Sequence, residues 1–361
     1  MNQSHHPRKK ALFLYFELAG YFISSLRQLT TSYDVDAHVV NYPVNAVAPF
    51  QFEKPDNIYF YERASFNRES LIKWIEELKP SFIFCCGWID KDYVAACKYF
   101  SGSITTVLSL DNPWQGKIKQ HIAGIIGKIY LSRIFHYAWV PGQPQVNYCK
   151  QLGFAKNAIF TGLYAADLQW FNQQYELNKA AKEKSFPKKL LFAGRYTEHK
   201  GVKEMWNAFV RLHNETPNDW ELWCLGKGEL EHLLPKHDKI KNFGFVQPAQ
   251  LGSFISQCGV FILASRLEHW GVVLHEFAAA GMPIISSDKT SAASSFLVDK
   301  KNGWLQKAGD EESMLQCFKQ MIAASNSELN VMATNSHQLA QSISPKQWAA
   351  TAWMLLNKKD G

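Results

Sequence analysis

Two glutamates lie eight positions apart in the stretch from Ser265 to Asp288, which reads SRLEHWGVVLHEFAAAGMPIISSD. Glu268 stands in a polar loop just before Gly271, and Glu276 stands inside a run that is otherwise apolar. A buried carboxylate without partners is costly, so Glu276 should be hydrogen-bonded by another group. Since carboxylates accept hydrogen bonds from vicinal hydroxyls, the pair predicts a site for the diols of a ribose and of a sugar. The alternative for Glu276 is a solvated or salt-bridged helix residue.

Two cations share one loop earlier in the chain, in LLFAGRYTEHKGVKEMWNAF. A strand is expected to end at Ala193, the pair Gly194-Arg195 turns out of it, and Lys200 comes just before a helix that begins near Val202. Cations beside the positive end of a helix favour a diphosphate. The alternative is that both are solvated loop charges.

Backbone groups add to this chemistry. RLEHWG is expected to be a loop and VVLHEFAAAG a helix, so the amides from His269 to Val273 are the free donors of a helix start. These donors suit an anionic or hydroxyl-rich ligand. A further turn, CLGKGELEHLL, carries Gly226 and Gly228 after a strand, although glycines there can also serve only to close the turn.

Alternating apolar runs and helical patterns must position these residues, and they predict βα units on parallel sheets. The strands expected in the first half are ALFLYF, DAHVVNY, SFIFCCG, ITTVLSL and HYAWVPG, with a helix in NRESLIKWIEELK. The second half restarts the scheme with strands in KLLFAGR, WELWCLG, CGVFILAS and GMPIISSD and with helices in GVKEMWNAFVRLHNE, AQLGSFISQ and GVVLHEFAAA. Two sheets explain this restart more economically than one.

The expected organisation is an N-terminal domain over residues 1–166, a linker over 167–189, a C-terminal domain over 190–342 and a terminal helix within 343–361. The linker prediction rests on the polar, charged composition of DLQWFNQQYELNKAAKEKSFPKK, which ends near a proline. Ligands of doubly wound sheets bind beyond the carboxyl ends of the strands. With two such domains, a cleft between them is the expected site.

Composition narrows the class of protein. The 361 residues are 47% hydrophobic and 20% charged, as in a soluble globular protein, and no apolar stretch reaches membrane-spanning length. The net charge of +7 favours anionic partners, although a mildly basic enzyme without a charged partner fits as well. The sequence contains no zinc finger, Lys/Arg-dense tract or aromatic-basic RNA motif, so nucleic acid is not expected as a partner. Seven scattered cysteines without metal-ligand spacing favour a reducing cytoplasm and predict no metal site.

Taken together, the ordered motifs resemble the nucleotide-sugar half of glycosyltransferase family 4, over Leu190 to Leu305. They are the E-x7-E spacing in EHWGVVLHE, with GRYTEHKGV, LGKGEL, NFGFVQPAQL and CGVFILASRLEHWG. The resemblance implies a retaining, metal-independent enzyme of the GT-B fold, with two Rossmann-like doubly wound parallel-sheet α/β domains facing across a cleft. It also implies that SPKQWAATAWM is a terminal helix that returns to the first domain, and that the first domain binds the acceptor.

The resemblance assigns roles by position. Arg195 and Lys200 would contact the donor diphosphate, Glu268 the donor-sugar hydroxyls, and Glu276 the ribose. Phe245 and Val246 would line the base of the nucleotide. The other residues expected on the donor side are Gly194, Gly226, His269, Trp270, Gly271 and Val272. After PIISSD, however, the family's Gly-Gly pair and glutamate are replaced by KTSAASSFLVDKKNGWL, which puts contacts from that loop to the phosphates in doubt.

The acceptor side matches the family less well. No histidine follows TTVLSL; Asp111 and Asn112 occupy that loop instead. Asp111 is predicted to orient an acceptor hydroxyl or take its proton, with capping of the turn before Pro113 as the alternative. Glu17 and Gly20, in ELAGYF, match the family's glycine-containing first loop only loosely.

One segment, QGKIKQHIAGIIGKIYLSRIF, combines an apolar face with cations. The apolar positions are Ile118, Ile122, Ile125, Ile126 and Ile129, and the cations are Lys117, Lys119, Lys128 and Arg133. This combination is expected of a helix lying on acidic membrane, at the inner face of the cell membrane. The alternative is an ordinary domain helix with a basic outer face.

The resulting prediction is a glycosyltransferase that moves a sugar from a UDP- or GDP-sugar to a saccharide or lipid-linked acceptor, in cell-surface polysaccharide or glycolipid synthesis. A nucleotide-sugar epimerase or hydrolase on the same fold, or a non-catalytic nucleotide-sugar-binding partner subunit, remains open. The missing histidine favours the partner subunit, whereas the two glutamates with Arg195 and Lys200 argue against it.

Overall fold

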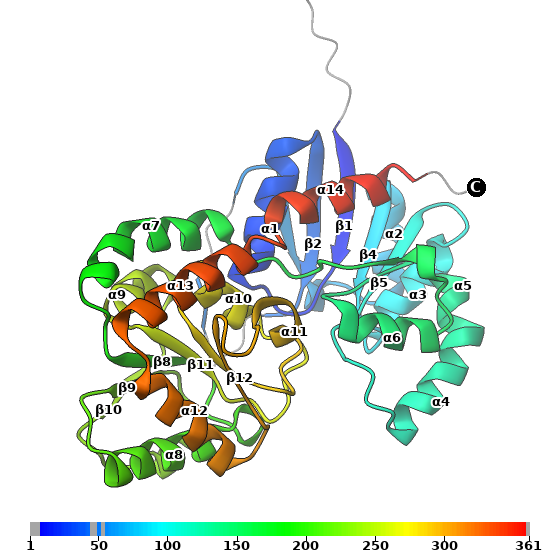
Figure 1. The fold of residues 1–361 in the computed structure, drawn as a ribbon. Coiled ribbons are helices and arrows are strands. Elements are labelled where there is room, and N and C mark those ends of the chain that lie inside the picture. Colours follow the sequence, from blue (N-terminus) through cyan, green and yellow to red (C-terminus); the bar gives the residue numbers. More distant parts are fainter. Residues whose placement is uncertain (1–7, 44–48, 52–54, 359–361) are drawn as a thin grey trace, which may run out of the picture. The chain divides into compact units, whose positions relative to one another are not determined.

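The computed structural model describes residues 8–43, 49–51 and 55–358, and the chain divides into two compact units (Figure 1). Unit 1 comprises Met1–Ala165 with Ile343–Gly361, and unit 2 comprises Ala166–Ser342. Each unit contains one sheet whose paired strands are parallel. The predicted fold class of two parallel-sheet α/β domains is therefore confirmed.

The sheet of unit 1 has seven strands within the described residues, in the order β3-β2-β1-β4-β5-β6-β7. They are β1 (Lys9–Leu14), β2 (Val35–Asn41), β3 (Ile58–Glu62), β4 (Phe82–Cys86), β5 (Thr105–Ser109), β6 (Tyr137–Trp139) and β7 (Ile159–Phe160). The central strands β1, β4 and β5 are almost wholly buried, as expected of parallel strands covered on both faces. The strands predicted from the sequence patterns did not include β3 and β7, which are partly exposed edge strands, and β7 has only two residues.

Helices cover this sheet. They are α1 (Gly20–Ser32), α2 (Arg68–Leu78), α3 (Lys91–Phe100), α4 (Ile118–Ile126), α5 (Ser132–Ile134), α6 (Gln143–Gln151) and the terminal α14 (Pro345–Leu356). The terminal helix packs against α1, as Figure 1 shows, and Trp348 of α14 is buried beside the ring of Phe13 in β1. Residues 343–358 are thus structurally part of unit 1.

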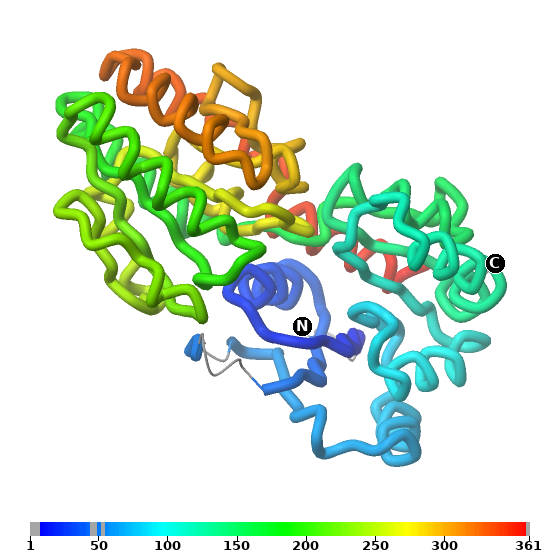
Figure 2. Tube along the Cα trace, turned by 90° about the horizontal axis from the view of Figure 1, so that it is seen from below, coloured from blue at the N-terminus to red at the C-terminus, as the bar shows by residue number. Residues whose placement is uncertain are grey.

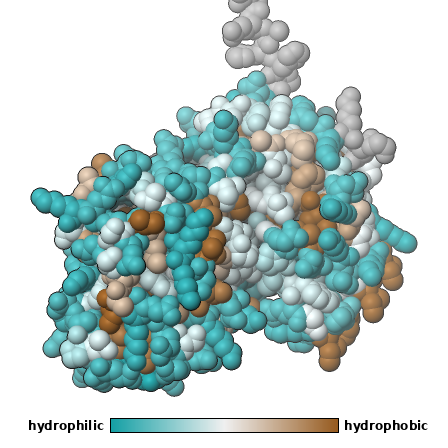
Figure 3. All heavy atoms as spheres, viewed as in Figure 1, coloured by the Kyte–Doolittle hydropathy of each residue, from teal (hydrophilic) through white to brown (hydrophobic). Residues whose placement is uncertain are grey.

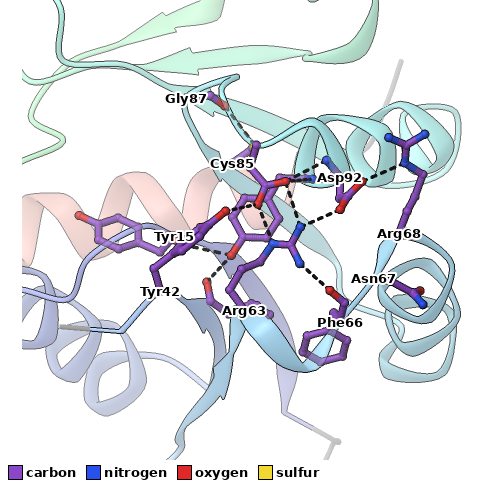
Figure 4. A network of polar contacts seen from close by, with 12 residues as sticks. Tyr15, Tyr42, Arg63, Phe66, Asn67, Arg68, Cys85, Gly87 and Asp92 are labelled. Atoms are coloured by element: carbon purple, nitrogen blue, oxygen red, sulfur yellow. Dashed lines mark hydrogen bonds and ion pairs between the residues drawn. The ribbon is translucent and has the colours of Figure 1, made fainter. Parts of the chain in front are cut away.

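A buried polar network fixes the carboxyl ends of β1, β2 and β4 in unit 1 (Figure 4). Asp90 caps α3 and accepts hydrogen bonds from Arg63 at 2.6 Å and from the Tyr42 hydroxyl at 2.7 Å. The Tyr93 hydroxyl donates to the backbone oxygens of Val40 at 3.1 Å and Tyr15 at 3.3 Å. The loops that leave these strands are therefore held in place.

The sheet of unit 2 has six strands within the described residues, in the order β10-β9-β8-β11-β12-β13. They are β8 (Lys189–Ala193), β9 (Glu221–Leu225), β10 (Ile240–Gly244), β11 (Val260–Leu263), β12 (Ile284–Ser287) and β13 (Gly303–Gln306). The strand order reverses between β8 and β11, and this switch point is where such sheets bind ligands. The edge strands β10 and β13 were not among the predicted strands, and β10 is mostly exposed.

The helices of unit 2 are α7 (Leu168–Lys184), α8 (Val202–Glu215), α9 (Leu251–Gln257), α10 (Val272–Ala279), α11 (Ala293–Phe296), α12 (Glu311–Ala323) and α13 (Asn326–Ala340). The expectation of a linker over 167–189 was wrong for most of that range, because α7 fills residues 168–184. Asp167 caps this helix, and its buried side, with Phe171 and Tyr175, packs on α10 and α13. Figure 2 shows α7 in green and α13 in orange side by side. The polar composition reflects a solvated outer face.

Candidate functional site

An ion pair between Lys200 and Glu268 crosses the switch point of the sheet in unit 2. Lys200 follows β8 and Glu268 follows β11, and these strands are neighbours. Ser265 Oγ donates a second hydrogen bond to Glu268 Oε2 at 3.0 Å. Both charged side chains are mostly buried, with 15% of Lys200 and 17% of Glu268 exposed. The cation and the carboxylate predicted to bind a donor thus meet at the carboxyl edge of one sheet.

The loop after β12 holds the loop of Glu268 in place. Glu268 N–H donates to the Lys289 oxygen at 3.0 Å, and Ser291 N–H donates to the Glu268 oxygen at 3.2 Å. Ala292 N–H donates to the Trp270 oxygen at 2.9 Å. The segment that departs from the family's Gly-Gly-Glu pattern therefore supports the glutamate loop through its backbone.

Gly271 is the N-cap residue of α10 and has a φ of +94°, a left-handed conformation that L side chains rarely adopt. A Cβ at this position would lie 2.9 Å from Glu268 Cγ and 3.1 Å from Leu263 Cδ2. The glycine lets the chain turn tightly beneath Glu268 and present the first amides of α10, including that of Val272. His269 is half buried, and Trp270 is buried, with its ring against Phe296 and its backbone oxygen hydrogen-bonded to Ala292.

Arg195 lies on the same loop as Lys200 and is exposed. Within the described residues it forms no ion pair. Between them stands His199, whose pKa is lowered first by burial and then by the charges of Lys200 and, more weakly, Arg195. Glu268 acts in the opposite direction. Burial is therefore the main reason for the lowered pKa of His199, and the charges of Lys200 and Arg195 add to it.

Glu276 lies in the first two turns of α10 and is half buried. Burial, with a smaller contribution from the nearby carboxyl of Asp167, raises the pKa of Glu276 to about 7. No hydrogen bond to the Glu276 carboxyl is found among the residues that the structure describes. Asp167 was missed in the sequence because it is about one hundred positions away. A carboxyl of this kind gains from any ligand that brings hydroxyl donors.

The neighbouring His275 shows the contrast. It is fully buried, its Nδ1 accepts from the Ala166 amide at 3.1 Å, and its Nε2 lies 2.8 Å from the Ala340 oxygen. Burial lowers the pKa of His275 to about 4, so the ring is neutral. Both ring nitrogens of His275 have partners within the fold, whereas the Glu276 carboxyl has no hydrogen bond among the described residues.

Glycines allow the β8 and β9 loops to approach closely. A Cβ on Gly226 would lie 1.9 Å from the Gly194 oxygen, and one on Gly228 would lie 2.4 Å from the Tyr196 oxygen. The role observed for Gly226 and Gly228 is therefore close backbone packing. Phe245 and Val246 follow β10 and are half buried.

The acceptor-side residues lie in unit 1, near the carboxyl ends of β1 and β5. Glu17 is exposed, and Gly20 is the first residue of α1, where a Cβ would meet no atom within 4 Å. Asp111 is half buried, and its backbone oxygen accepts from Gln145 at 2.9 Å. Asn112 is exposed. Gly20 thus shows no close approach that would require glycine.

Sequence reasoning missed a cluster of phenols and a thiol beside Asp111. The rings of Tyr21 and Tyr164 meet edge to face at 5.3 Å. The pKa of the Tyr164 hydroxyl is raised well above its usual value, first by burial and then by the Asp111 carboxylate. Burial likewise raises the pKa of the Cys86 thiol to about 12. No sequence signal links these residues, since they come from four separate segments.

No group of three or more His, Cys, Asp or Glu side chains that could hold a metal ion is found among the described residues. Nor does any helix in the described ranges combine the length and apolarity needed to cross a membrane.

Residues 174–338 match the family model of the glycosyl transferases group 1. The chain is 28% identical over 152 residues to the lipopolysaccharide core biosynthesis glycosyltransferase LpsE of Rhizobium meliloti, covering 40% of this chain and 42% of LpsE. It is 25% identical over 169 residues to the GtfA subunit of the UDP-N-acetylglucosamine–peptide N-acetylglucosaminyltransferase of Streptococcus pneumoniae, covering 45% of this chain and 34% of that protein.

The chain therefore spans less than half the length of these curated relatives. Among solved structures, Anabaena HepE in complex with UDP is similar with a TM-score of 0.72 and 13% identity, over 96% of this chain and 98% of HepE. Likeness at this identity shows the fold. Residues 174–338 are thus similar in sequence to the glycosyl transferases group 1, and nearly the whole chain is similar in fold to HepE.

Proposed function

We propose that this chain is a retaining, metal-independent glycosyltransferase that moves a hexosyl or related sugar from a UDP- or GDP-sugar to an acceptor hydroxyl. The observation that carries the proposal is the Lys200–Glu268 pair at the switch point of the sheet in unit 2. A phosphate-binding cation next to a hydroxyl-binding carboxylate matches a sugar 1-phosphate, in which hydroxyls and phosphate are joined through one ring.

The strand order supports the proposed positions of the residues that bind the other parts of the donor. Following the sheet from β11 through β8 and β9 to β10, the loops carry Glu268, then Arg195 and Lys200, then Gly226, and finally Phe245 and Val246. The groups proposed to bind the sugar, the diphosphate and the base thus follow one another along one edge of the sheet. In this proposal Glu276 accepts hydrogen bonds from the ribose diol.

The proposed reaction exchanges one bond at the anomeric carbon. The bond from that carbon to the diphosphate oxygen breaks, and its electron pair leaves with the diphosphate. The acceptor oxygen forms its bond on the same face, and its proton passes to the departing phosphate oxygen. Arg195, Lys200 and the first amides of α10 stabilise the negative charge that develops there.

In unit 1 we propose that Asp111 orients the acceptor hydroxyl, with Glu17, Gly20 and Asn112 nearby. After burial, the Asp111 carboxylate is the next cause of the raised pKa of Tyr164, so these two polar groups lie close together. The proposed acceptor is a saccharide or lipid-linked molecule of cell-surface polysaccharide or glycolipid synthesis. The relative LpsE is named for lipopolysaccharide core biosynthesis.

We also propose that the protein works in the cytoplasm, with peripheral contact to acidic membrane. All seven cysteines lie within the described residues and are free thiols, which fits a reducing compartment. Six of them are buried.

The test begins with a thermal-shift panel of UDP-, GDP- and ADP-sugars, because a bound donor raises the apparent stability. Donor consumption is then measured with and without a membrane fraction of the source organism as acceptor. Transfer only with acceptor supports the proposal, donor turnover without it indicates an epimerase or hydrolase, and binding without turnover indicates a partner subunit. Glu268→Gln and Lys200→Met should each lower transfer strongly, and near-normal turnover in both would refute the assignment.

A further inference from the structure

Helix α4 and the π-helical turn that follows it, Gly127–Leu131, present a row of isoleucines to solvent. The exposed fractions are 79% for Ile118, 53% for Ile122, 65% for Ile125, 55% for Ile126 and 60% for Ile129. Figure 3 shows a brown, apolar patch at the lower right, where Figure 1 places α4. Their spacing puts them on one side of a helix, and we call this set the isoleucine face.

The opposite side of the same helix attaches it to unit 1. Gly124 and Gly127 are buried against the end of α6, and a Cβ on Gly127 would lie 2.7 Å from Leu152 Cδ2. Leu131 and Ile134 continue this buried side. An ordinary surface helix turns its large apolar residues toward the core. Here the buried side of α4 carries glycines and its outer side carries isoleucines, which an ordinary domain helix with only a basic outer face would not show.

Cations flank the isoleucine face. Lys117, Lys119, Lys128 and Arg133 are exposed, and none of them forms an ion pair within the described residues. The sequence contains no Asp or Glu between Asp111 and Asp167. The surface around this helix is therefore both apolar and positively charged.

We infer that the isoleucine face docks on an anionic lipid bilayer. Residues 118–134 run as one helical segment through α4, the π-helical turn Gly127–Leu131 and α5, about 25 Å long at 1.5 Å per residue. Such a helix can lie flat in the interface, with isoleucines among the acyl chains and cations among the anionic headgroups.

Charge argues for lipid over a second copy of this chain. A two-fold contact through the isoleucine face would set the four cations of each copy against those of the other, with no carboxylate in the segment to pair them. An anionic headgroup layer supplies the missing negative charge. The role of this docking, which is to hold the enzyme at a lipid-linked acceptor, rests on the proposed function.

The test is co-sedimentation of the full chain with vesicles of phosphatidylcholine alone and with about one third phosphatidylglycerol. Binding should require the anionic lipid and should weaken when NaCl is raised from about 0.05 M to about 0.5 M. Ile122→Ser with Ile125→Ser should lower the partition coefficient roughly tenfold or more. Lys117→Gln with Lys119→Gln should lower it roughly fivefold for each cation removed.

The matched control is Leu177→Ser with Val331→Ser, which removes two exposed aliphatic side chains from helices of unit 2, and it should bind vesicles like the native chain. Lys346→Gln is the corresponding charge control. The inference is overturned if the native chain ignores phosphatidylglycerol, if the isoleucine variant binds normally, or if sedimentation shows that this variant converts a dimer to a monomer. Donor binding, followed separately by thermal shift, should stay native in the isoleucine variant, so failure of docking and failure of the proposed function are distinguished.

Discussion

Replacement of Glu276 by glutamine should change how donor affinity depends on pH. In the free protein, burial and Asp167 raise the pKa of Glu276 to about 7. A ribose diol would donate hydrogen bonds to this carboxyl, which favours its ionised form and lowers the pKa in the complex. Donor binding should therefore release a proton at pH values below 7.

The size of the effect follows from that pKa. At pH 6 roughly nine tenths of the free protein would carry the proton, and only the ionised remainder would bind well. The apparent Kd should rise about tenfold from pH 8 to pH 6. In Glu276→Gln this slope should vanish, with weaker binding at pH 8.

In the protein without ligand, the titration of Glu276 should also change the free energy of unfolding. The unfolded glutamate loses its proton near its ordinary value of 4.5, whereas the folded one keeps it up to about 7. Between these values the folded state binds more protons, so the free energy of unfolding falls as pH rises, by at most about 3 kcal/mol. Glu276→Gln should lack this loss.

Calorimetric titration with a nucleotide sugar is the assay, because the diphosphate of a nucleotide sugar is esterified at both ends and does not titrate near neutral pH. Buffers of different ionisation enthalpy report the released proton directly. His199→Gln is the control for the other titratable group of this region, and it should keep the tenfold slope. An equal slope in the native chain and in Glu276→Gln would refute the assignment of Glu276.

Three other predictions concern the donor loops. Arg195→Ala should lower the transfer rate about a hundredfold or more while leaving thermal stability near native, because this side chain is exposed and has no ion pair in the described residues, as kinetics and thermal unfolding would show. Gly271→Ala should destabilise the chain by about 1 to 2 kcal/mol and displace Glu268, lowering transfer at least roughly tenfold, whereas Gly102→Ala, which meets no atom within 4 Å, should do neither. Transfer should persist in excess chelator, and loss restored by a divalent cation would contradict the metal-free proposal.

The donor side was accessible to sequence reasoning because its residues sit beside strand ends. Arg195 and Lys200 follow an apolar strand, and Glu268 and Gly271 stand between another strand and a helix. Strand order then brings these loops together. The sequence pattern does not predict which of these side chains touch each other, such as Lys200 and Glu268 in their ion pair.

Features that depend on distant neighbours were missed. Asp167 influences Glu276 only because α7 packs on α10, and the polar composition of α7 resembled that of a linker. Tyr164 reaches Asp111 from a segment without a motif. The direction of the isoleucines on α4 could not be predicted either, since periodicity shows a stripe but not which side of the helix meets the core.

The central claim is that unit 2 binds the diphosphate of a nucleotide sugar through the loop of Arg195 and Lys200. The most direct measurement is calorimetric titration of UDP- and GDP-sugars into the native chain and into Arg195→Ala with Lys200→Ala. We predict saturable binding of one of these donors to the native chain and a loss of about a hundredfold or more in the double variant. Absence of binding to the native chain, or equal affinity in the double variant, would contradict the claim.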